Sequence, residues 1–474
     1  PPTPAPPPTP HYTLGRSSAA SDVYKRQVPT PASHTFTGSV DDIVTATTTE
    51  GTAVPYGGTS EFSAAVTVTL GAFVVNSTGD LGDLAFGDGV CDTGGTVGSD
   101  PECTLRAAIG QANAQPGDDV IHFSIPVGDS GHLGGVWTIS PASTLPPVST
   151  TMTIDGTTQP GFVANSIAAP GGLNGTQAIV VEGSGAGSVD GFTVTGNDVA
   201  ISGLTVNTFD GRGVVVAGDD AKLTAVYVGT HSGGAVAQPN SGTGIYITGA
   251  RATIGGPNPE DRFLVSGNDV QGIDVSGIDA TILGGIIGLN SVATLPLPNG
   301  ANGVRLSGIT GATVGASGAG NVISGNNLVP ATADGIYISA GGTHTIEANL
   351  IGTNLAGAAL GNYNAGIAIS GASNVTIGGS GGGEGNVISA NGAYGVDISG
   401  AGADSNTLIG NFIGTDAAGT ADLGNGSDGV AIRSGAQSNT IGGLLAGERN
   451  YISGNDNDGV WITGSGTELN EVQG

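Results

Sequence analysis

Apolar residues recur at every second position in short runs along most of the chain, and small polar residues separate these runs. Between residues 366 and 391, for example, the runs "GIAIS", "VTIGG" and "NVISAN" follow one another. Alternation with a period of two is typical of β-strands, whereas Gly, Asn, Ser and Asp are typical of turns. No helical period appears between these runs. The pattern therefore predicts units of about three short strands.

The units repeat at an almost constant length. A pattern of Gly, aliphatic, any residue, aliphatic returns at intervals of 28 to 34 residues, beginning at Gly213, Gly244, Gly272, Gly303, Gly335, Gly366, Gly395, Gly429 and Gly459. Two unit types alternate, which gives a full period of about 62 residues. Three short strands repeated at fixed length predict an all-β parallel solenoid, or β-helix, of about 10 to 12 coils. Coils stacked at ~4.8 Å would form a rod of roughly 50 to 60 Å.

The solenoid accounts for the residues that recur. Aliphatic residues after each repeat glycine would form an inward column, and β-branched side chains suit a pleated surface. The phrases "GNVISGN" (320–326), "GNVISAN" (385–391), "RNYISGN" (449–455) and "RFLVSGN" (262–268) repeat asparagines in register. Stacked Asn side chains can hydrogen-bond along the axis, so we expect a structural role. The predicted ladders contain Asn321, Asn386 and Asn450, and Asn268, Asn326, Asn391 and Asn455.

Charge narrows the classes of partner. The chain of 474 residues has 11 basic and 39 acidic residues, which gives a formal net charge of −28. Nucleic acids and anionic membranes require a basic surface, so neither is expected as a partner. No apolar run reaches about 18 residues, and we therefore expect no membrane span. A self-repelling acidic surface favours a soluble monomer.

Cys91 and Cys103 are the two cysteines of the chain, in "VCDTGGTVGSDPEC". A close, isolated pair in an acidic chain predicts one disulfide and an oxidising compartment. The alternative is a pair of unbonded buried thiols. A zinc site would need two further ligands, and no nearby His supplies them.

Residues 87–126, "GDGVCDTGGTVGSDPECTLRAAIGQANAQPGDDVIHFSIP", resemble the CSLREA-motif region of bacterial surface proteins. "CTLRAAIGQAN" stands where that family has Cys-Ser-Leu-Arg-Glu-Ala, with Ala107 in place of the Glu. "TIDGTTQPGF" (153–162) and the phrases "IGTD" and "NVISGN" are similar to the β-helix repeats that follow this motif. The resemblance covers residues 72–474. It implies a right-handed, pectate-lyase-like β-helix, secretion and a surface location, and little about activity.

Four segments follow from these patterns. Residues 1–31 combine a polyproline-like stretch with a segment like translated adapter sequence, and we expect no native structure there. Residues 32–71 are interpreted as the tail of an upstream region. Residues 72–126 are expected to form an N-terminal cap, with a short helix that begins after Thr104 and stops at Pro116. Residues 127–474 are expected to form the β-helix, ending partway through a repeat; any signal peptide would lie upstream.

The third position after each repeat glycine varies and should point outward from one strand face. These residues are Val215, Tyr246, Asp274, Arg305, Tyr337, Ala368, Asp397, Ala431 and Trp461. Tyr246, Arg305, Tyr337 and Trp461 are candidates for binding an extended extracellular polysaccharide, because aromatic and charged groups stack on and hydrogen-bond to sugars. The simpler interpretation is a solvated strand face with ion pairs of little consequence.

The leading functional hypothesis is a secreted or cell-surface structural or adhesion protein without its own catalytic site. The alternative is a polysaccharide lyase or glycoside hydrolase on the same scaffold, for which Asp274, Arg305 and Asp397 are weak catalytic candidates. The strings typical of polygalacturonases, Asn-Thr-Asp and Gly-His-Gly, do not occur. An enzyme would therefore need acids and an Arg to converge on one outer face.

The acidic loop "NSTGDLGDLAFGDGVCD" contains Asp80, Asp83, Asp88 and Asp92. Calcium favours such oxygen-rich loops. The spacing matches neither an EF-hand nor a glycine–aspartate nonapeptide repeat. We expect no cofactor, with calcium at these four residues as the alternative.

Overall fold

The computed structural model describes residues 43–44, 66–67, 72–326 and 333–474. Contacts divide the chain into two units, residues 1–70 and 71–474. In the first unit, β1 (Ile43–Val44) pairs with β2 (Val66–Thr67) in antiparallel orientation. The predicted segment 1–31 and most of the predicted segment 32–71 lie outside the described residues.

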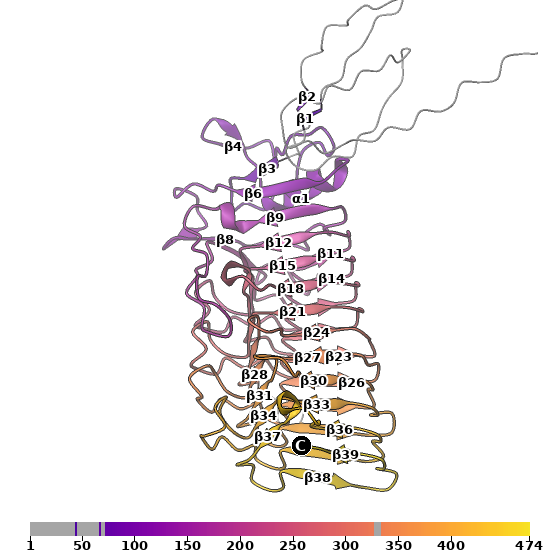
Figure 1. The fold of residues 1–474 in the computed structure, drawn as a ribbon. Coiled ribbons are helices and arrows are strands. Elements are labelled where there is room, and N and C mark those ends of the chain that lie inside the picture. The colour runs from indigo at the N-terminus through magenta and orange to yellow at the C-terminus, as the bar shows by residue number, and fades with distance from the viewer. Residues whose placement is uncertain (1–42, 45–65, 68–71, 327–332) are drawn as a thin grey trace, which may run out of the picture. The chain divides into compact units, whose positions relative to one another are not determined.

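The second unit is a right-handed parallel β-helix built from three long sheets (Figure 1). The sheet of thirteen strands contains β3 (Ala72–Val75), β6 (Asp119–Phe123), β9 (Met152–Asp155), β12 (Ala200–Ser202), β15 (Lys222–Thr224), β18 (Thr253–Gly255), β21 (Thr281–Leu283), β24 (Thr313–Val314), β27 (Thr345–Ile346), β30 (Thr376–Gly378), β33 (Thr407–Ile409), β36 (Thr440–Ile441) and β39 (Glu471–Val472). The sheet of ten contains β11 (Phe192–Val194), β14 (Val214–Val216), β17 (Ile245–Ile247), β20 (Ile273–Val275), β23 (Val304–Ser307), β26 (Ile336–Ser339), β29 (Ile367–Ser370), β32 (Val396–Ser399), β35 (Val430–Arg433) and β38 (Val460–Thr463).

The third sheet, of twelve strands, contains β7 (His132–Leu133), β8 (Val136–Ile139), β10 (Ile179–Glu182), β13 (Leu204–Asn207), β16 (Tyr227–Val228), β19 (Leu264–Val265), β22 (Ile286–Ile287), β25 (Val322–Ile323), β28 (Leu350–Ile351), β31 (Val387–Ile388), β34 (Phe412–Ile413) and β37 (Tyr451–Ile452). Its first pair, β7 and β8, is antiparallel. Short 3-10 turns occur at η1 (Gly156–Thr158), η2 (Pro259–Asp261) and η3 (Ala446–Glu448). The predicted all-β fold with three short strands per coil is therefore confirmed.

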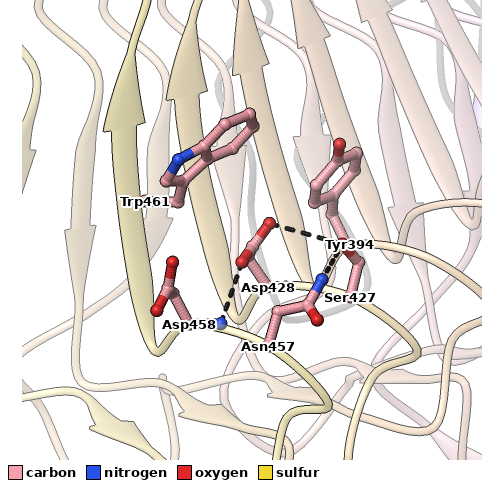
Figure 2. Close-up of a pocket in the computed structure, with 6 residues that line it drawn as sticks. All are labelled: Tyr394, Ser427, Asp428, Asn457, Asp458 and Trp461. Atoms are coloured by element: carbon pink, nitrogen blue, oxygen red, sulfur yellow. Dashed lines mark hydrogen bonds between the residues drawn. The ribbon is translucent and has the colours of Figure 1, made fainter.

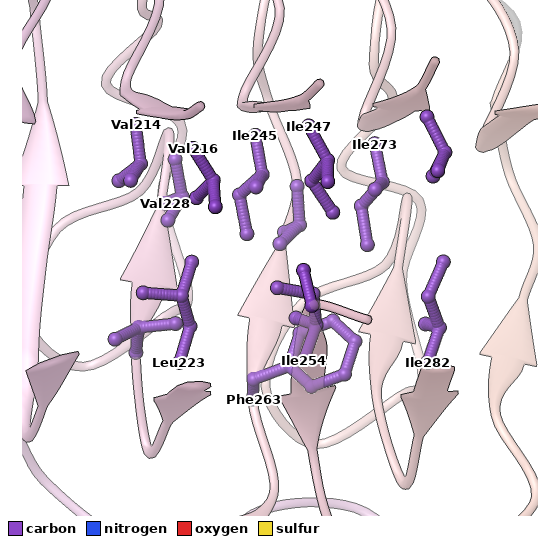
Figure 3. Packing of buried hydrophobic residues seen from close by; sticks show 14 of the residues in the cluster. Val214, Val216, Leu223, Val228, Ile245, Ile247, Ile254, Phe263, Ile273 and Ile282 are labelled. Carbon is purple, nitrogen blue, oxygen red and sulfur yellow. The ribbon is translucent and has the colours of Figure 1, made fainter. Parts of the chain in front are cut away.

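Columns of aliphatic side chains fill the interior. Ile245 pairs in register with Ile273, and Ile273 pairs with Val304, so like residues stack along the axis. All three are fully buried. Figure 3 shows Ile245 and Ile273 facing Ile254 and Ile282 of the thirteen-stranded sheet across the core. Val, Ile and Leu predominate in the core, and a few buried aromatic residues such as Phe263 pack among them.

Three asparagine ladders run along the β-helix, and each takes one Asn from every coil that it spans. In each ladder the Nδ2 atom donates to the Oδ1 atom of the next Asn, at 2.8 to 3.0 Å. The first runs through Asn240, Asn268, Asn299, Asn326, Asn362, Asn391, Asn425 and Asn455. The second runs through Asn321, Asn349, Asn386, Asn411 and Asn450, and a third through Asn406, Asn439 and Asn470.

The structure thus places the seven predicted asparagines in two ladders. In each ladder they are every second member. The members between them come from the other unit type, whose phrases have different letters. Each Asn also donates to a backbone carbonyl, as Asn391 does to Ile351 O at 3.2 Å. The ladders therefore satisfy buried amides and corner backbone together.

α1 (Leu105–Ala114) packs against β3 and β6 at the N-terminal end, and the exposed antiparallel pair β4 (Thr96–Val97) and β5 (Asp100–Pro101) precedes it in the chain. Thr104 caps the helix by accepting a hydrogen bond from Ala107 N at 3.1 Å. A disulfide joins Cys91 to Cys103 beside it. β3 and β6 lie within the predicted cap segment 72–126 and also begin the thirteen-stranded sheet. The cap is therefore continuous with the β-helix.

Among the residues that the structure describes, none of the helices has the length and apolar character needed to cross a bilayer.

Candidate functional site

The variable third positions form one outward column on the ten-stranded sheet. Tyr246 of β17 lies beside Asp274 of β20, which lies beside Arg305 of β23 and then Tyr337 of β26. The same register continues through Ala368, Asp397, Ala431 and Trp461. The repeat glycine directly precedes each of these strands. We call this surface the column face.

Two charged pairs interrupt the column face. Arg305 donates to both carboxylate oxygens of Asp274, at 2.9 and 2.8 Å. Arg433 holds Asp397 in the same bidentate manner, also at 2.9 and 2.8 Å. Each carboxylate is nearly covered, and each guanidinium is about one third exposed. Hydrogen bonding to the paired carboxylate raises the pKa of both arginines, which keeps them charged.

The candidate catalytic residues do not converge. Asp274 and Asp397 lie on β20 and β32, four strands apart in the ten-stranded sheet. Four steps of ~4.8 Å separate them by roughly 19 Å. Paired carboxylates in glycoside hydrolysis are only about 5 to 9.5 Å apart. The structure therefore brings Asp274 and Arg305 together and places Asp397 four strands away, beside its own partner Arg433.

An open concavity of about 530 Å³ lies towards the C-terminal end of the column face. It is lined by Tyr394, Ser427, Asp428, Asn457, Asp458 and Trp461. Figure 2 shows the rings of Tyr394 and Trp461 on opposite sides, with Asp428 between them. In the column between Asp397 and Trp461 stands Ala431, which is fully buried. Ala431 is thus covered by its neighbours and is not among the residues that line the concavity.

Hydrogen bonds fix the polar floor of this concavity. The backbone N–H of Asp458 donates to one oxygen of Asp428 at 2.9 Å, and the Ser427 hydroxyl donates to the other at 3.3 Å. Asn457 Nδ2 donates to the Ser427 hydroxyl oxygen at 3.2 Å. The carboxylate of Asp428 is thus held in one orientation. Oriented acceptors between two aromatic rings can take hydroxyl donors from a ring-shaped ligand.

Arginine–aromatic contacts extend the column face. The guanidinium of Arg212 lies 4.2 Å from the centroid of the Tyr246 ring, and that of Arg433 lies 5.6 Å from the Tyr394 ring. Both distances are within the range of cation–π attraction. The predicted residues Tyr246 and Tyr337 are partly exposed on this face, and Trp461 is 37% exposed.

Asp334 occupies the position directly before the repeat Gly335, near Tyr337. It accepts hydrogen bonds from Asn364 Nδ2 at 2.8 Å and from Ala365 N at 2.9 Å. Burial raises its pKa to about 7, in spite of these two bonds. The next coil carries Ala365 and Ala368 at the two equivalent positions. The carboxyl group is therefore surrounded by protein rather than presented to a ligand.

Sequence reasoning missed most of the concavity. Tyr394, Asp428 and Asp458 share the position directly before a repeat glycine, which varies from coil to coil as Thr243, Gln271, Asn302, Asp334, Ala365, Tyr394, Asp428 and Asp458. The variation at this position indicates outward-facing residues, as it does at the third position after the repeat glycine. Arg433 was missed since it lies two residues beyond the column, on β35.

The four acidic residues predicted as calcium ligands each form hydrogen bonds or an ion pair with different groups of the protein. Asp80 is paired with Arg106 at 2.9 Å, and Asp83 accepts from Ala85 N and Asp92 N. Asp88 accepts from Val90 N and Asp92 from Gly94 N. Within residues 72–326 and 333–474, three or more metal-ligating side chains do not gather at one point. The structure therefore does not bring the four candidates together.

Comparison with known proteins gives matches to structures alone. No protein-family model matches the sequence, and no curated protein matches it. The A-module of the Azotobacter vinelandii mannuronan C-5 epimerase AlgE6 matches with a TM-score of 0.47 and 13% identity, over 78% of this chain and 94% of the other. The A-module of AlgE4 from the same organism matches with a TM-score of 0.45 and 15% identity, over 85% and 97%. The pectate lyase Pel9A matches with a TM-score of 0.29 and 11% identity, over 84% and 79%.

Proposed function

We propose that this protein is a secreted or cell-surface β-helix that binds a polysaccharide chain along its column face, without a catalytic site of its own. The observation that carries the proposal is the concavity between Tyr394 and Trp461, with Asp428 held between the rings. Sugar rings offer apolar faces for stacking and hydroxyl groups for donation to carboxylates.

The charge of the site favours a neutral polysaccharide. The six lining residues include two carboxylates, Asp428 and Asp458, and no cationic side chain. The nearby guanidinium of Arg433 is engaged by Asp397. A polyuronate would bring further negative charge to an acidic surface, whereas a neutral chain would bring hydroxyl donors.

Location and assembly are part of the same proposal. The Cys91–Cys103 bridge and the CSLREA-like segment support export to an oxidising environment. The strongly acidic surface supports a monomer, with surface polysaccharide as its partner.

The alternative, a carbohydrate-active enzyme, would now rest on Asp428 and Asp458 rather than on the column residues predicted from sequence. These two lie on adjacent coils, and both line the concavity. Their oxygens are acceptors that could serve sugar hydroxyls without any bond breaking. Binding alone accounts for the same geometry without a general acid or a nucleophile. The following experiment distinguishes binding from catalysis.

The test is affinity electrophoresis and calorimetry of the full chain with two sets of soluble polymers. The neutral set is β-glucan, mannan and xylan, and the acidic set is alginate and polygalacturonate. We expect retention by at least one neutral polymer, and roughly fivefold weaker binding for Y394A and W461A, since stacking contributes about 1 kcal/mol. The exposed Tyr363 lies outside the concavity, so Y363A is the matched control.

Failure to bind any polymer, or equal binding by Y394A, W461A and Y363A, would overturn the proposal. Release of reducing or unsaturated ends by the protein, abolished in D428N or D458N, would replace it with the enzyme.

A further inference from the structure

Four similar loops fold back over the outer face of the twelve-stranded sheet, one in every second coil. Their ends are joined by the bridges Thr230–Ala237, Leu289–Pro296, Thr353–Ala359 and Thr415–Asp422. We number them first to fourth in chain order. They cover a second apolar cluster, to which Tyr227, Leu289, Leu350 and Val387 belong.

The loops share one turn. Gly234, Ala293, Gly357 and Gly419 all have a left-handed backbone, with φ of 66, 54, 71 and 67°. Each of the four donates its N–H to the carbonyl three residues earlier, at His231, Asn290, Asn354 and Asp416. Positions can therefore be compared directly from loop to loop.

Hydrogen bonds tie each of the second and third loops to the loop before it. In the second loop, Ser291 donates through its hydroxyl to Gly233 O at 2.9 Å and through its N–H to Gly234 O at 2.8 Å. In the third loop, Asn354 Nδ2 donates to Ala293 O at 2.7 Å.

The fourth loop has Asp416 where the third has Asn354. An ionised carboxylate has no hydrogen to donate, so it cannot make the bond to Gly357 O that Asn354 makes to Ala293 O. Asp416 instead accepts from Thr420 N and Ala421 N, at 2.7 and 3.0 Å. These bonds lower its pKa and keep it ionised.

A slot of about 240 Å³ is present between the third and fourth loops. Leu350, Val387, Leu355 and Leu423 supply apolar lining, and Gly357 and Asp416 line it as well. This volume is several times the space that one water needs. The slot is therefore sized for a small group and not for a sugar chain or a protein domain.

We propose that this slot binds a protonated primary alkylamine. The ammonium would donate to Asp416 and to the carbonyl of Gly357, in place of the amide that the third loop supplies to Ala293. The aliphatic stem would lie on Leu350 and Val387. The ammonium could belong to a free amine or to the lysine side chain of a protein, and this inference does not depend on the proposed polysaccharide binding.

The test is titration of the methyl-labelled protein with n-butylammonium chloride, followed through the NMR signals of Leu350, Leu355, Val387 and Leu423. We expect saturable shifts with butylammonium and at least fivefold weaker ones with n-butanol. D416N should respond at least tenfold less, because the new amide can bond Gly357 O and close the slot. Asn already occupies this position in the second and third loops, so D416N should fold.

A second variant is expected to gain binding, so the test does not depend only on a loss of binding in D416N. N354D removes the donor to Ala293 O and should open a second slot, reported by the methyl signals of Leu289 and Leu295 on titration with butylammonium. Equal shifts with butanol, or an unchanged response in D416N, would overturn the proposal. Nα-acetyl-lysine N-methylamide distinguishes the sources: binding at least as tight as butylammonium indicates a protein lysine, and weaker binding indicates a free amine.

Discussion

The carboxylate of Asp274 is almost completely covered and takes both of its hydrogen bonds across the sheet from Arg305. Removing the guanidinium leaves this carboxylate without its partner. We expect R305M to lower the free energy of unfolding by about 1 to 3 kcal/mol, the usual cost of an unsatisfied buried polar group. Denaturant unfolding followed by circular dichroism measures this change.

Arg251 provides the matched control, because it pairs with Asp219 and Asp220 with its side chain half exposed. Exposed pairs contribute at most about 1 kcal/mol. Equal losses in R251M and R305M would show that burial of Asp274 does not matter.

Arg262 is 1% exposed and is bound by carbonyl oxygens rather than by an acid. Its guanidinium donates to Gly284 O at 2.7 Å and to Gly171 O at 2.6 Å, and it reaches three further carbonyls, those of Ile167, Ala168 and Gly172. Burial lowers its pKa to about 10. The side chain therefore fastens the loop 165–174 onto a coil about 90 residues later in sequence.

We expect R262M to cost about 3 kcal/mol or more, since several buried carbonyls lose their donor. Limited proteolysis should then cut within 165–174 faster than in the unaltered protein. R262K keeps the charge but not the planar fork, and intermediate cleavage is expected. Cleavage of R262M at the unaltered rate would disprove the fastening role.

Asp334 lowers the free energy of unfolding as the pH rises, which is the reverse of the usual effect of a carboxyl group. Its pKa in the folded protein is about 7, raised from 3.8, so the folded state binds the proton more tightly than the unfolded chain does. This contribution to stability is complete below about pH 4 and is lost as the pH rises to 7. Facing groups are Asn364, which donates to the carboxylate, and Asp397, whose charge also raises the pKa.

We expect the difference in unfolding midpoint between the unaltered protein and D334N to change between about pH 4 and 7, in favour of D334N at the higher pH, and to level off above that range. Asp119, whose pKa is raised to about 6 by burial and by Asp118, is present in both proteins and cancels in this comparison. A difference that does not vary with pH would contradict the assignment.

Asn391 tests the ladder. Its Nδ2 atom donates to Asn425 Oδ1 at 3.0 Å and to Ile351 O at 3.2 Å. N391D has no such donor and places a charge at a position that is 1% exposed, so a loss of roughly 3 kcal/mol or more is expected.

N455D is the control, because Asn455 is only partly buried. Hydrogen exchange of the coils on either side of each site is the measurement, since solenoids open locally. Similar exchange in N391D and N455D would contradict a ladder that depends on burial.

The period of the sequence was sufficient to predict the coil, its strands and the register of the column face. Tyr246, Asp274 and Arg305 are neighbours because stacking places equal positions of successive units side by side. The loops were harder to predict. Consecutive aliphatic residues such as Val322 and Ile323 are both fully buried, one beneath the loops and one in the core. A strand covered on both faces loses its alternation, so the pattern did not reveal the outer layer.

The candidate site was predicted in part. Trp461 belongs to the concavity, but Tyr394 and Asp428 lie directly before the repeat glycine, at a position outside the predicted outward column. The separation of Asp274 from Asp397 follows directly from counting coils. The pairing of Asp397 with Arg433 does not, because it crosses diagonally between residues that are not in register.

The asparagine ladder gives the rod a direction. Between neighbouring members, the Nδ2 of the earlier Asn donates to the Oδ1 of the later Asn at each step from Asn240 to Asn455. A coil can therefore join the stack in one orientation, and each junction is chemically the same as the next. Such a chain can gain or lose whole repeats without any change in the hydrogen bonds between its coils. Its length can therefore evolve separately from the residues on its surface.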